Sequence, residues 1–482
     1  MPPAWLGLRL EDMFCEYFEA RVCRSCPLMG VPYSQQVRDK ERASRRALAS
    51  LDRPSSRRNP AQPPAAKSQF EWLPTFRSPQ KEFRNKAKMV VSGSKKSIVL
   101  GLAPTKEFPA GVDLQSCPLY VPAIRAAFAP IRAWLQRLGA RPYNIATAKG
   151  EVKYALVSAN PAGELMVRLV LRSKAALHRI ENTWSELQAE LPHLRVFSVN
   201  IQPEHTTVIE GREEIILSEE KFISMPGIGT DLWLAPGAFF QTNTAASQAM
   251  YTQAATWARE LQPETAWDLY CGVGGFAFAL SSAGVAQVTG VEVVGPAIDG
   301  AKKAVAEMAG VTAASPVGQG VENTLESSRG DAVPRPHFIT ADATKWACNQ
   351  KLVPPDLVVV NPPRRGLGPE LSSWLEHSGI PHLIYSSCFQ ETLVEDLHRM
   401  RSYRITAAKL VDMFPHTSHV ECLVLLSRRS SSHKFSAMED QTPNNYSTCR
   451  QMIGSKSYVV YRSDRFVRGI VHTLHFKNWH RC

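Results

Sequence analysis

The chain has 482 residues, 44% hydrophobic and 21% charged, which is ordinary for a globular protein and enough for two or three domains. Its formal net charge of +12 favours a polyanionic partner, nucleic acid before membrane. No apolar run reaches 18 residues, and no basic segment followed by an apolar one begins the chain. We therefore expect no transmembrane helix, no secretory signal and a cytoplasmic location.

Cysteines mark the first predicted segment, residues 1–37. Ten cysteines in this length do not indicate a disulfide scaffold, and clustered cysteines in a cytosolic protein more often bind metal or act in catalysis. Cys15, Cys23 and Cys26 are spaced C-x7-C-x2-C, and Cys117 is a lone cysteine farther along. Three close cysteines and a distant fourth are typical of an iron–sulfur cluster, but four thiolates also bind zinc, so the spacing leaves both open.

The next two regions differ in composition. Residues 38–80 are rich in Arg, Ser and Pro, and we interpret them as the end of a solvated helix followed by a basic linker. Residues 81–232 are predicted to form an α+β domain that binds RNA and completes the cysteine site. Its predicted elements are strands within 83–93, 154–158, 165–171 and 196–201, helices over 121–138 and 177–191, and a short strand over 231–234.

Residues 233–428 are predicted to form an α/β domain with a doubly wound, mostly parallel sheet, because strands and helices alternate along them. In chain order we expect a helix over 245–261, a strand ending near 268, a helix over 276–283, a strand over 286–293, a helix ending at 308, strands over 338–342, 357–360 and 382–385, a helix over 391–400, and strands over 407–413 and 422–426. Residues 311–336, rich in Gly, Ser and Pro, interrupt the domain as a surface insertion. Residues 429–482 are a polar tail of unassigned function, with a weak strand over 457–461.

A glycine-rich turn lies at the centre of this domain. Asp268 comes near the end of a strand, Gly272, Gly274 and Gly275 follow, and a helix begins directly after them. Glycine allows a sharp turn and a close approach of the backbone to a ligand, and Glu292, about 20 residues farther on, is placed to bind a ribose diol. The G-x-G-x-x-G fingerprint of dinucleotide sites is not met, and no lysine follows as in a P-loop. The pattern is closer to the loop of S-adenosylmethionine-dependent methyltransferases, and a nicotinamide dehydrogenase is the alternative.

Three further features come at the carboxyl ends of predicted strands, where open α/β sheets bind ligands. Residues 361–366 (NPPRRG) follow a buried strand, and Asn361 is expected to point into the crevice. Cys388 comes between a strand and a helix; residues 387–390 fit a capping box, and the helix dipole favours a thiolate there. Glu421 begins the last apolar strand and is a candidate general base.

A cysteine, a carboxylate and a methyl donor together indicate one reaction. A thiolate that adds to C6 of uracil makes C5 nucleophilic enough to attack a sulfonium methyl group. A base then removes the C5 proton, and elimination frees the cysteine. The target base has to leave its stack to reach such a pocket.

Residues 15 to about 427 resemble the RNA uracil-C5 methyltransferases, and are most similar to their bacterial 23S rRNA branch, RlmC. The matching stretches are 23–26 (CRSC), 83–93 (FRNKAKMVVSG), 200–203 (NIQP), 239–243 (FFQTN), 268–276 (DLYCGVGGF), 361–366 (NPPRRG), 385–388 (YSSC) and 413–417 (MFPHT). The resemblance implies a Rossmann-like methyltransferase domain, with Cys388 as nucleophile and Glu421 as proton-abstracting base. It also implies 23S-type rRNA as the substrate, with no membrane and no obligate protein partner; the alternatives are a tRNA substrate, or an RNA-binding protein with a decayed site.

The resemblance further implies two sets of binding residues. Gln241, Tyr270, Glu292 and Asn361 are expected to contact S-adenosylmethionine, with Asn361 also facing the target base; Gly272 and Asp342 complete the predicted cofactor-binding set. Cys15, Cys23, Cys26 and Cys117 are expected to hold a 4Fe–4S cluster. The sequence departs from the family where Phe389 and Gln390 follow Cys388, since the family usually has Asn after its nucleophile.

Overall fold

The computed structural model describes residues 13–49, 51, 70–310, 334–349 and 351–429. Most of the predicted insertion 311–336, and all of the predicted tail 429–482 except residue 429, lie outside the described residues, as does the predicted strand 457–461 within that tail. Among the described residues, no helix combines the length and the apolar character needed to cross a membrane.

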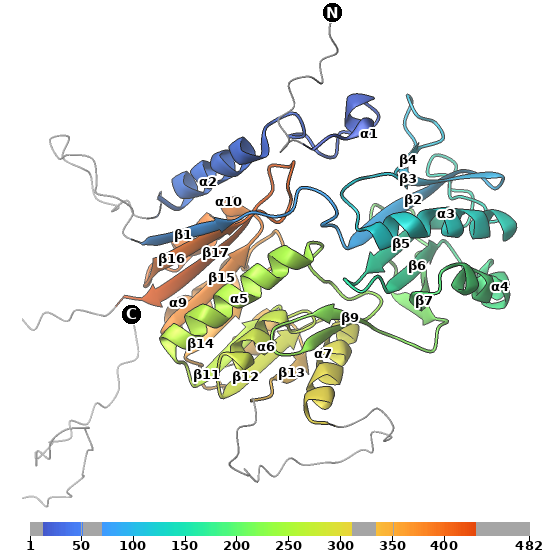
Figure 1. Cartoon of the computed structure of the whole chain (residues 1–482). Helices are drawn as coiled ribbons and strands as arrows, with labels where there is room; N and C mark the ends of the chain where they lie inside the picture. Colours follow the sequence, from blue (N-terminus) through green and yellow to red (C-terminus); the bar gives the residue numbers. More distant parts are fainter. Residues whose placement is uncertain (1–12, 50, 52–69, 311–333, 350, 430–482) are drawn as a thin grey trace, which may run out of the picture. The chain divides into compact units, whose positions relative to one another are not determined.

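The larger of two main sheets has eight strands in the order β1-β16-β17-β15-β14-β11-β12-β13 (Figure 1). These strands are β1 (Glu71–Phe76), β11 (Thr265–Leu269), β12 (Gln287–Glu292), β13 (His337–Thr340), β14 (Leu357–Val360), β15 (His382–Ser387), β16 (Tyr403–Val411) and β17 (Glu421–Arg428). All neighbours are parallel except β17, which is antiparallel to both β15 and β16. The carboxyl ends of β11, β12, β14 and β15 therefore lie at one edge, and β17 begins at that same edge.

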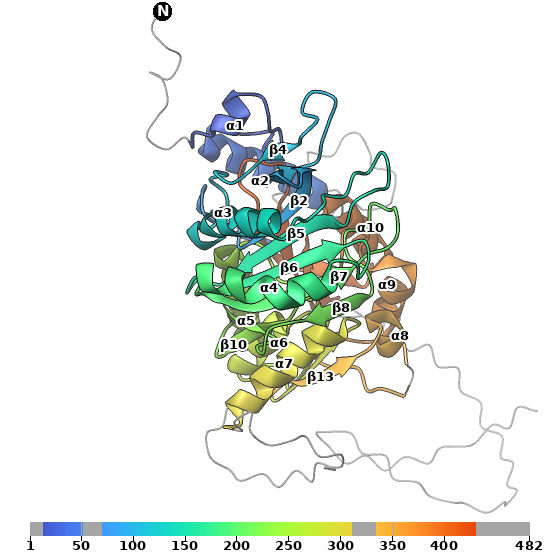
Figure 2. The same ribbon diagram turned by 90° about the vertical axis from the view of Figure 1, so that its right-hand side faces the viewer.

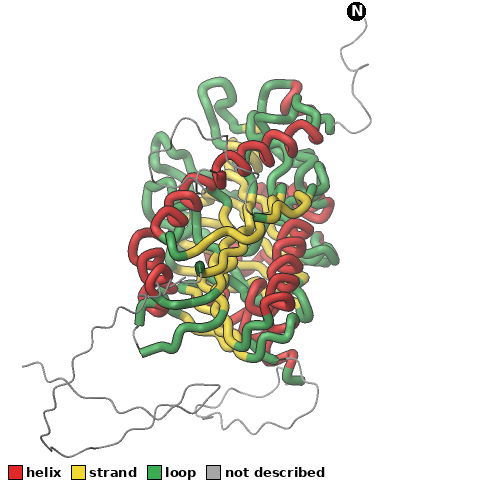
Figure 3. Tube along the Cα trace, turned by 90° about the vertical axis from the view of Figure 1, so that its left-hand side faces the viewer, coloured by secondary structure: helices red, strands yellow, loops and turns green. Residues whose placement is uncertain are grey.

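Helices cover both faces of this sheet; Figure 3 shows the strands (yellow) between helices (red) on either side. Leu357 and Val359 of β14 pack into a core with α5, α6 and α7, while Val358 and Val360 pack into a second core with α8, α9 and α10. The helices are α5 (Thr244–Leu261), α6 (Gly275–Ser282), α7 (Gly295–Met308), α8 (Ala343–Ala347), α9 (Gly368–His377) and α10 (Gln390–Arg399). A strand buried on both faces needs a continuous apolar sequence, as the four residues of β14 have.

The second main sheet has seven strands in the order β4-β3-β2-β5-β6-β7-β8, and α3 and α4 pack against one of its faces (Figure 2). Its elements are β2 (Lys86–Ser94), β3 (Ser97–Leu102), β4 (Val112–Asp113), α3 (Pro122–Arg137), β5 (Val152–Ala159), β6 (Leu165–Leu171), α4 (Leu177–Glu190), β7 (Leu194–Ile201) and β8 (Glu213–Ile216). A two-stranded sheet of β9 (Ile223–Pro226) and β10 (Asp231–Leu234) follows.

The segment predicted as a linker, residues 38–80, contains regular structure at both ends. Residues up to Ala49 belong to α2 (Tyr33–Ala49), which follows the short α1 (Glu16–Glu19), and β1 forms the parallel edge strand beside β16. Pro74 lies within β1, where the register shifts. Proline cannot donate to a ladder and is tolerated on an edge strand, so its presence concealed this strand in the sequence.

Candidate active site

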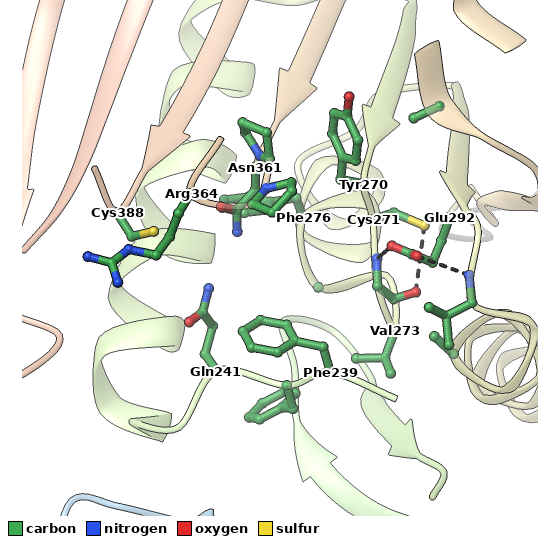
Figure 4. A pocket seen from close by; sticks show the side chains of 18 of the residues that line it. Phe239, Gln241, Tyr270, Cys271, Val273, Phe276, Glu292, Asn361, Arg364 and Cys388 are labelled. Carbon is green, nitrogen blue, oxygen red and sulfur yellow. Dashed lines mark hydrogen bonds between the residues drawn. The ribbon is translucent and has the colours of Figure 1, made fainter. Parts of the chain in front are cut away.

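One cavity of about 620 Å³ opens at the carboxyl edge of the eight-stranded sheet (Figure 4). This volume is in the range of ordinary small-ligand sites. All eight predicted catalytic and cofactor-binding residues line it: Gln241, Tyr270, Gly272, Glu292, Asp342, Asn361, Cys388 and Glu421. The structure therefore brings together side chains that lie up to 180 positions apart in the sequence.

The glycine-rich turn forms one wall of this cavity. Tyr270, Gly272 and Gly274 have φ angles of 65°, 54° and 90°, so the chain reverses through the left-handed region directly after β11. A Cβ on Gly275 would lie only 2.2 Å from Cζ of the buried Tyr251 ring. Asp268 at the end of β11 accepts a hydrogen bond from the Ala277 amide at 2.9 Å, which ties the strand to the first turn of α6.

Glu292 is held rigidly at one end of the cavity, at the end of β12. Its carboxylate accepts hydrogen bonds from the amides of Gly272 (3.2 Å), Val293 (2.9 Å) and Val294 (3.0 Å). Asp342 follows β13 and caps α8 by accepting a hydrogen bond from the Lys345 amide. Glu292 ends the strand next to β11, as its spacing from the glycine-rich turn predicted, and Asp342 follows the next strand along the sheet, β13.

Gln241 and Asn361 lie between Glu292 and Cys388 in the view of Figure 4, with their amide groups directed into the same space. The backbone around Gln241 is fixed from a distant segment. Asn85 donates from its side chain to the Gln241 carbonyl at 2.9 Å, and its own amide donates to the Thr242 carbonyl at 2.9 Å. Asn243 then caps α5 and donates to the Met413 carbonyl at 3.0 Å.

Cys388 lines the opposite end of the cavity, but not as part of a capped helix. Ser387 stays in β15, paired with Cys422, and its hydroxyl accepts from the Phe389 amide; α10 begins at Gln390 with no side-chain cap. The predicted capping box is therefore wrong. Burial, and then the nearby Glu421, raise the pKa of the Cys388 thiol, while Arg364 opposes them, so the predicted preference for the thiolate in the free protein is also wrong.

Glu421 begins β17 and is 2% exposed. The Ser386 hydroxyl donates to its Oε1 at 2.5 Å. Burial raises the pKa of Glu421 to about 7, and the Ser386 hydrogen bond lowers it only in part. A carboxyl group with a pKa near neutrality can exchange a proton at the pH of the cell, which is the property a general base needs.

Comparison with known proteins decides the family. The family model described as tRNA (Uracil-5-)-methyltransferase matches residues 178–429. A protein of Halothiobacillus neapolitanus named 23S rRNA (uracil(747)-C(5))-methyltransferase RlmC is 39% identical over 419 residues, covering 86% of this chain and 100% of the relative. Its namesake in Edwardsiella ictaluri is 37% identical over 420 residues, covering 87% and 100%. The chain belongs to the RNA uracil-C5 methyltransferase family.

The predicted family and its RlmC branch are thereby confirmed. The predicted Rossmann-like methyltransferase fold is confirmed as well. The crystal structure of Pyrococcus abyssi tRNA (uracil-54, C5)-methyltransferase in complex with S-adenosyl-L-homocysteine superposes with a TM-score of 0.59. It covers 83% of this chain and 85% of its own at 22% sequence identity, a level at which the likeness is one of fold.

Several cavity residues of this uracil-C5 methyltransferase were not predicted. Phe239 and Val293 are large apolar side chains that are 62% and 64% exposed at the cavity, and His419 lines it as well. The guanidinium of Arg364 lies 5.2 Å from the ring centroid of Phe389, and Figure 4 shows the Arg364 side chain extending past Cys388. Phe239 and Arg364 belong to the matching stretches 239–243 and 361–366, which was the available signal.

The four predicted cluster ligands also come together. Cys15, Cys23, Cys26 and Cys117 are free thiols. Burial raises the pKa of Cys26 to about 12, and Cys117, Cys23 and Cys15 add to this rise by charge repulsion, so the four share one neighbourhood. Within the described ranges, however, no set of three or more His, Cys, Asp or Glu side chains is arranged to hold a metal ion.

Proposed function

We propose that this family member transfers a methyl group from S-adenosylmethionine to C5 of a uridine in 23S-type rRNA. The observation that carries the proposal is that Cys388 and the buried Glu421 line the same cavity as the glycine-rich turn and Glu292. The names of the relatives that are 37–39% identical over their whole length support rRNA as the substrate. The net charge of +12 fits a polyanionic partner.

The cofactor would lie along the wall formed by the glycine-rich turn. Glu292, whose carboxylate is oriented by three backbone amides, would accept hydrogen bonds from a ribose diol. Gly272 leaves room for close backbone approach, and Tyr270 and Asp342 flank the same wall. S-adenosylmethionine supplies a methyl group on a sulfonium centre. Gln241 and Asn361 lie between this wall and Cys388, where they would orient the cofactor and the target base.

The two catalytic side chains act in different steps of the reaction. The sulfur of Cys388 forms a bond to C6 of uracil, and the electron pair moves to C5, which takes the methyl group. Glu421 then accepts the C5 proton, and the C6–sulfur bond breaks to release 5-methyluridine and the thiolate. Glu421 suits this step because burial holds its pKa at about 7.

We also infer that Cys15, Cys23, Cys26 and Cys117 hold a 4Fe–4S cluster. The donor set is four free cysteines, of which Cys117, Cys23 and Cys15 lie close enough to Cys26 to raise its pKa. A single zinc ion binds thiolates at about 2.3 Å, which requires their sulfurs to lie within about 4 Å of each other. A 4Fe–4S cluster instead takes one thiolate on each of its four irons, which is the number of cysteines in this set. The cluster would fix the amino-terminal segment to the seven-stranded sheet.

Methyl transfer to rRNA tests the main proposal. With labelled S-adenosylmethionine, wild-type protein should transfer label to rRNA and form a covalent adduct with RNA containing 5-fluorouracil, because fluorine replaces the proton that Glu421 must remove. Cys388→Ala should lose both. Equal labelling by Cys388→Ala, or transfer to tRNA alone, would contradict the proposal. RNA binding without transfer would favour a decayed site, for which Phe389 is the sequence signal.

Metal analysis tests the cluster. Protein purified without oxygen should contain about four iron and four sulfide ions per chain. Cys23→Ser should lower this content, whereas Cys348→Ser, a cysteine outside the set, should keep it. A colourless wild-type protein with stoichiometric zinc would refute the cluster.

A further inference from the structure

The helix α2 contacts both chain segments that deliver the catalytic side chains, although it carries none itself. It lies beside α10 (Figure 1) and contacts the loop between β16 and β17. Three of its residues, Gln36, Lys40 and Ser44, are spaced by four positions and are therefore on one face. All three are buried, at 1%, 5% and 0% exposure. A stripe of buried polar residues is costly unless each finds a partner.

Gln36 holds the loop that leads into Glu421. At the centre of this loop His416 has a φ of 65°, a conformation that non-glycine residues rarely adopt and that persists only when its surroundings enforce it. Its amide donates to Gln36 Oε1 at 2.8 Å, and its carbonyl accepts from the Leu28 amide at 3.0 Å. Its Nε2 donates to the Gln80 carbonyl at 3.0 Å, which leaves Nδ1 to accept from Gln36 Nε2 at 3.3 Å.

Lys40 fixes the start of the same loop. Its Nζ lies 2.6 Å from Asp412 Oδ1, and the two side chains are 4% and 0% exposed. The same ammonium donates to the Phe414 carbonyl at 3.1 Å. An ion pair this deeply buried contributes little net stability but fixes the relative position of the groups it joins.

Ser44, one turn farther along α2, contacts the segment that carries the nucleophile. The side-chain amide of Gln390 donates to Ser44 Oγ, and Ser44 in turn donates to the Lys40 carbonyl at 2.8 Å. Gln390 is the first residue of α10 and comes two positions after Cys388. One face of α2 thus reaches the Glu421 loop at Gln36 and Lys40, and the Cys388 segment at Ser44.

We propose that α2 is a positioning element that fixes the positions of Cys388 and Glu421 relative to each other, a role that rests on the function proposed above. Gln36 and Lys40 determine where Glu421 enters the cavity, and Ser44 determines where Cys388 enters it. Misplacement of a reacting group by about 1 Å can cost on the order of a hundredfold in rate. The two ends of α2 therefore affect different steps of the reaction.

The test uses full-length protein and separates these steps. Gln36→Ala should lower turnover more than tenfold and accumulate a methylated RNA–protein adduct on ordinary uracil RNA, because a displaced Glu421 leaves the C5 proton in place. Ser44→Ala should instead slow adduct formation with 5-fluorouracil RNA several-fold. Gln35→Ala, a neighbouring glutamine whose side chain pairs only with the exposed Arg38 in the described structure, is the matched control and should behave as wild type.

Binding of S-adenosylhomocysteine should remain within twofold of wild type in all three variants, since its wall is built by other elements; this also verifies that they fold. Wild-type turnover in Gln36→Ala and unchanged adduct formation in Ser44→Ala would overturn the proposal. The proposal would also be overturned if a smaller folded fraction of the variant proteins fully explained their losses of turnover and adduct formation. If wild-type protein itself forms no adduct, the proposed function fails, which is a distinguishable result.

Discussion

At the scale of single residues, Glu421 combines two properties that usually exclude each other. It is almost completely buried, yet it has to become charged to accept a proton. The Ser386 hydroxyl stabilises the charged form by one short hydrogen bond, whereas burial favours the neutral form and dominates. With the resulting pKa of about 7, this carboxyl group is neither fully ionised nor fully protonated near neutral pH.

This balance predicts a pH profile. Glu421 must be deprotonated to act, and the Cys388 thiol, whose pKa is raised above its usual value, must lose its proton as well. The rate should therefore rise steeply with pH up to about 7, where both groups lose protons, and less steeply above it, where only the thiol still titrates. Ser386→Ala removes the interaction that lowers the pKa of Glu421 and should shift this rise to higher pH. The measurement is single-turnover methyl transfer between about pH 5.5 and 9.

Ser427→Ala is the control for that shift. Ser427 lies on β17, the strand that Glu421 begins, but it pairs with His382 at the far end of β15. Its profile should match that of wild type. A Ser386→Ala profile that does not move, or that moves to lower pH, would contradict the assignment of Glu421 as the base.

At the scale of elements, the glycine-rich turn and α5 depend on each other. Gly275 has no Cβ where the buried Tyr251 ring of α5 passes, and Gly275→Ala would force Tyr251 or the start of α6 to move. We expect the affinity for S-adenosylhomocysteine to fall more than tenfold and the melting temperature to fall by several degrees. Titration calorimetry and thermal denaturation measure the two effects.

Gly295→Ala is the matched substitution. Gly295 also begins a helix beside the cavity, α7, but a Cβ there meets no atom within 4 Å. It should keep wild-type affinity. Equal affinity in both variants would show that the close approach of Tyr251 to the turn does not shape the cofactor wall.

The elements that were best predicted from the sequence are those whose own run of apolar residues identifies them. The strands 165–171, 231–234 and 357–360 have their predicted bounds as β6, β10 and β14. Those that escaped prediction depend on distant partners. β1 contains a proline and is recognisable only beside β16, and the buried face of α2 is polar because its partners are Asp412, His416 and Gln390. The capping box failed because strand pairing with Cys422 holds Ser387.

At the scale of the whole molecule, the candidate site was more predictable than the contacts that support it. Several of the predicted cavity residues carry a local signal, such as a glycine turn, a proline stop after a strand or a carboxylate at a strand end. The supporting contacts have none. Asn85 reaches the Gln241 backbone from the seven-stranded sheet, and Leu28, two positions after Cys26, binds the His416 carbonyl. The predicted cysteine segment is thereby connected to the loop that precedes Glu421.

The central claim is that this molecule methylates a uridine of 23S-type rRNA at C5 through Cys388. The most direct measurement maps 5-methyluridine in total rRNA and tRNA from cells with and without this protein. We predict that one 5-methyluridine disappears from 23S-type rRNA when the protein is absent and returns with the wild-type protein but not with Cys388→Ala. An unchanged rRNA map, or a loss confined to tRNA, would contradict the claim.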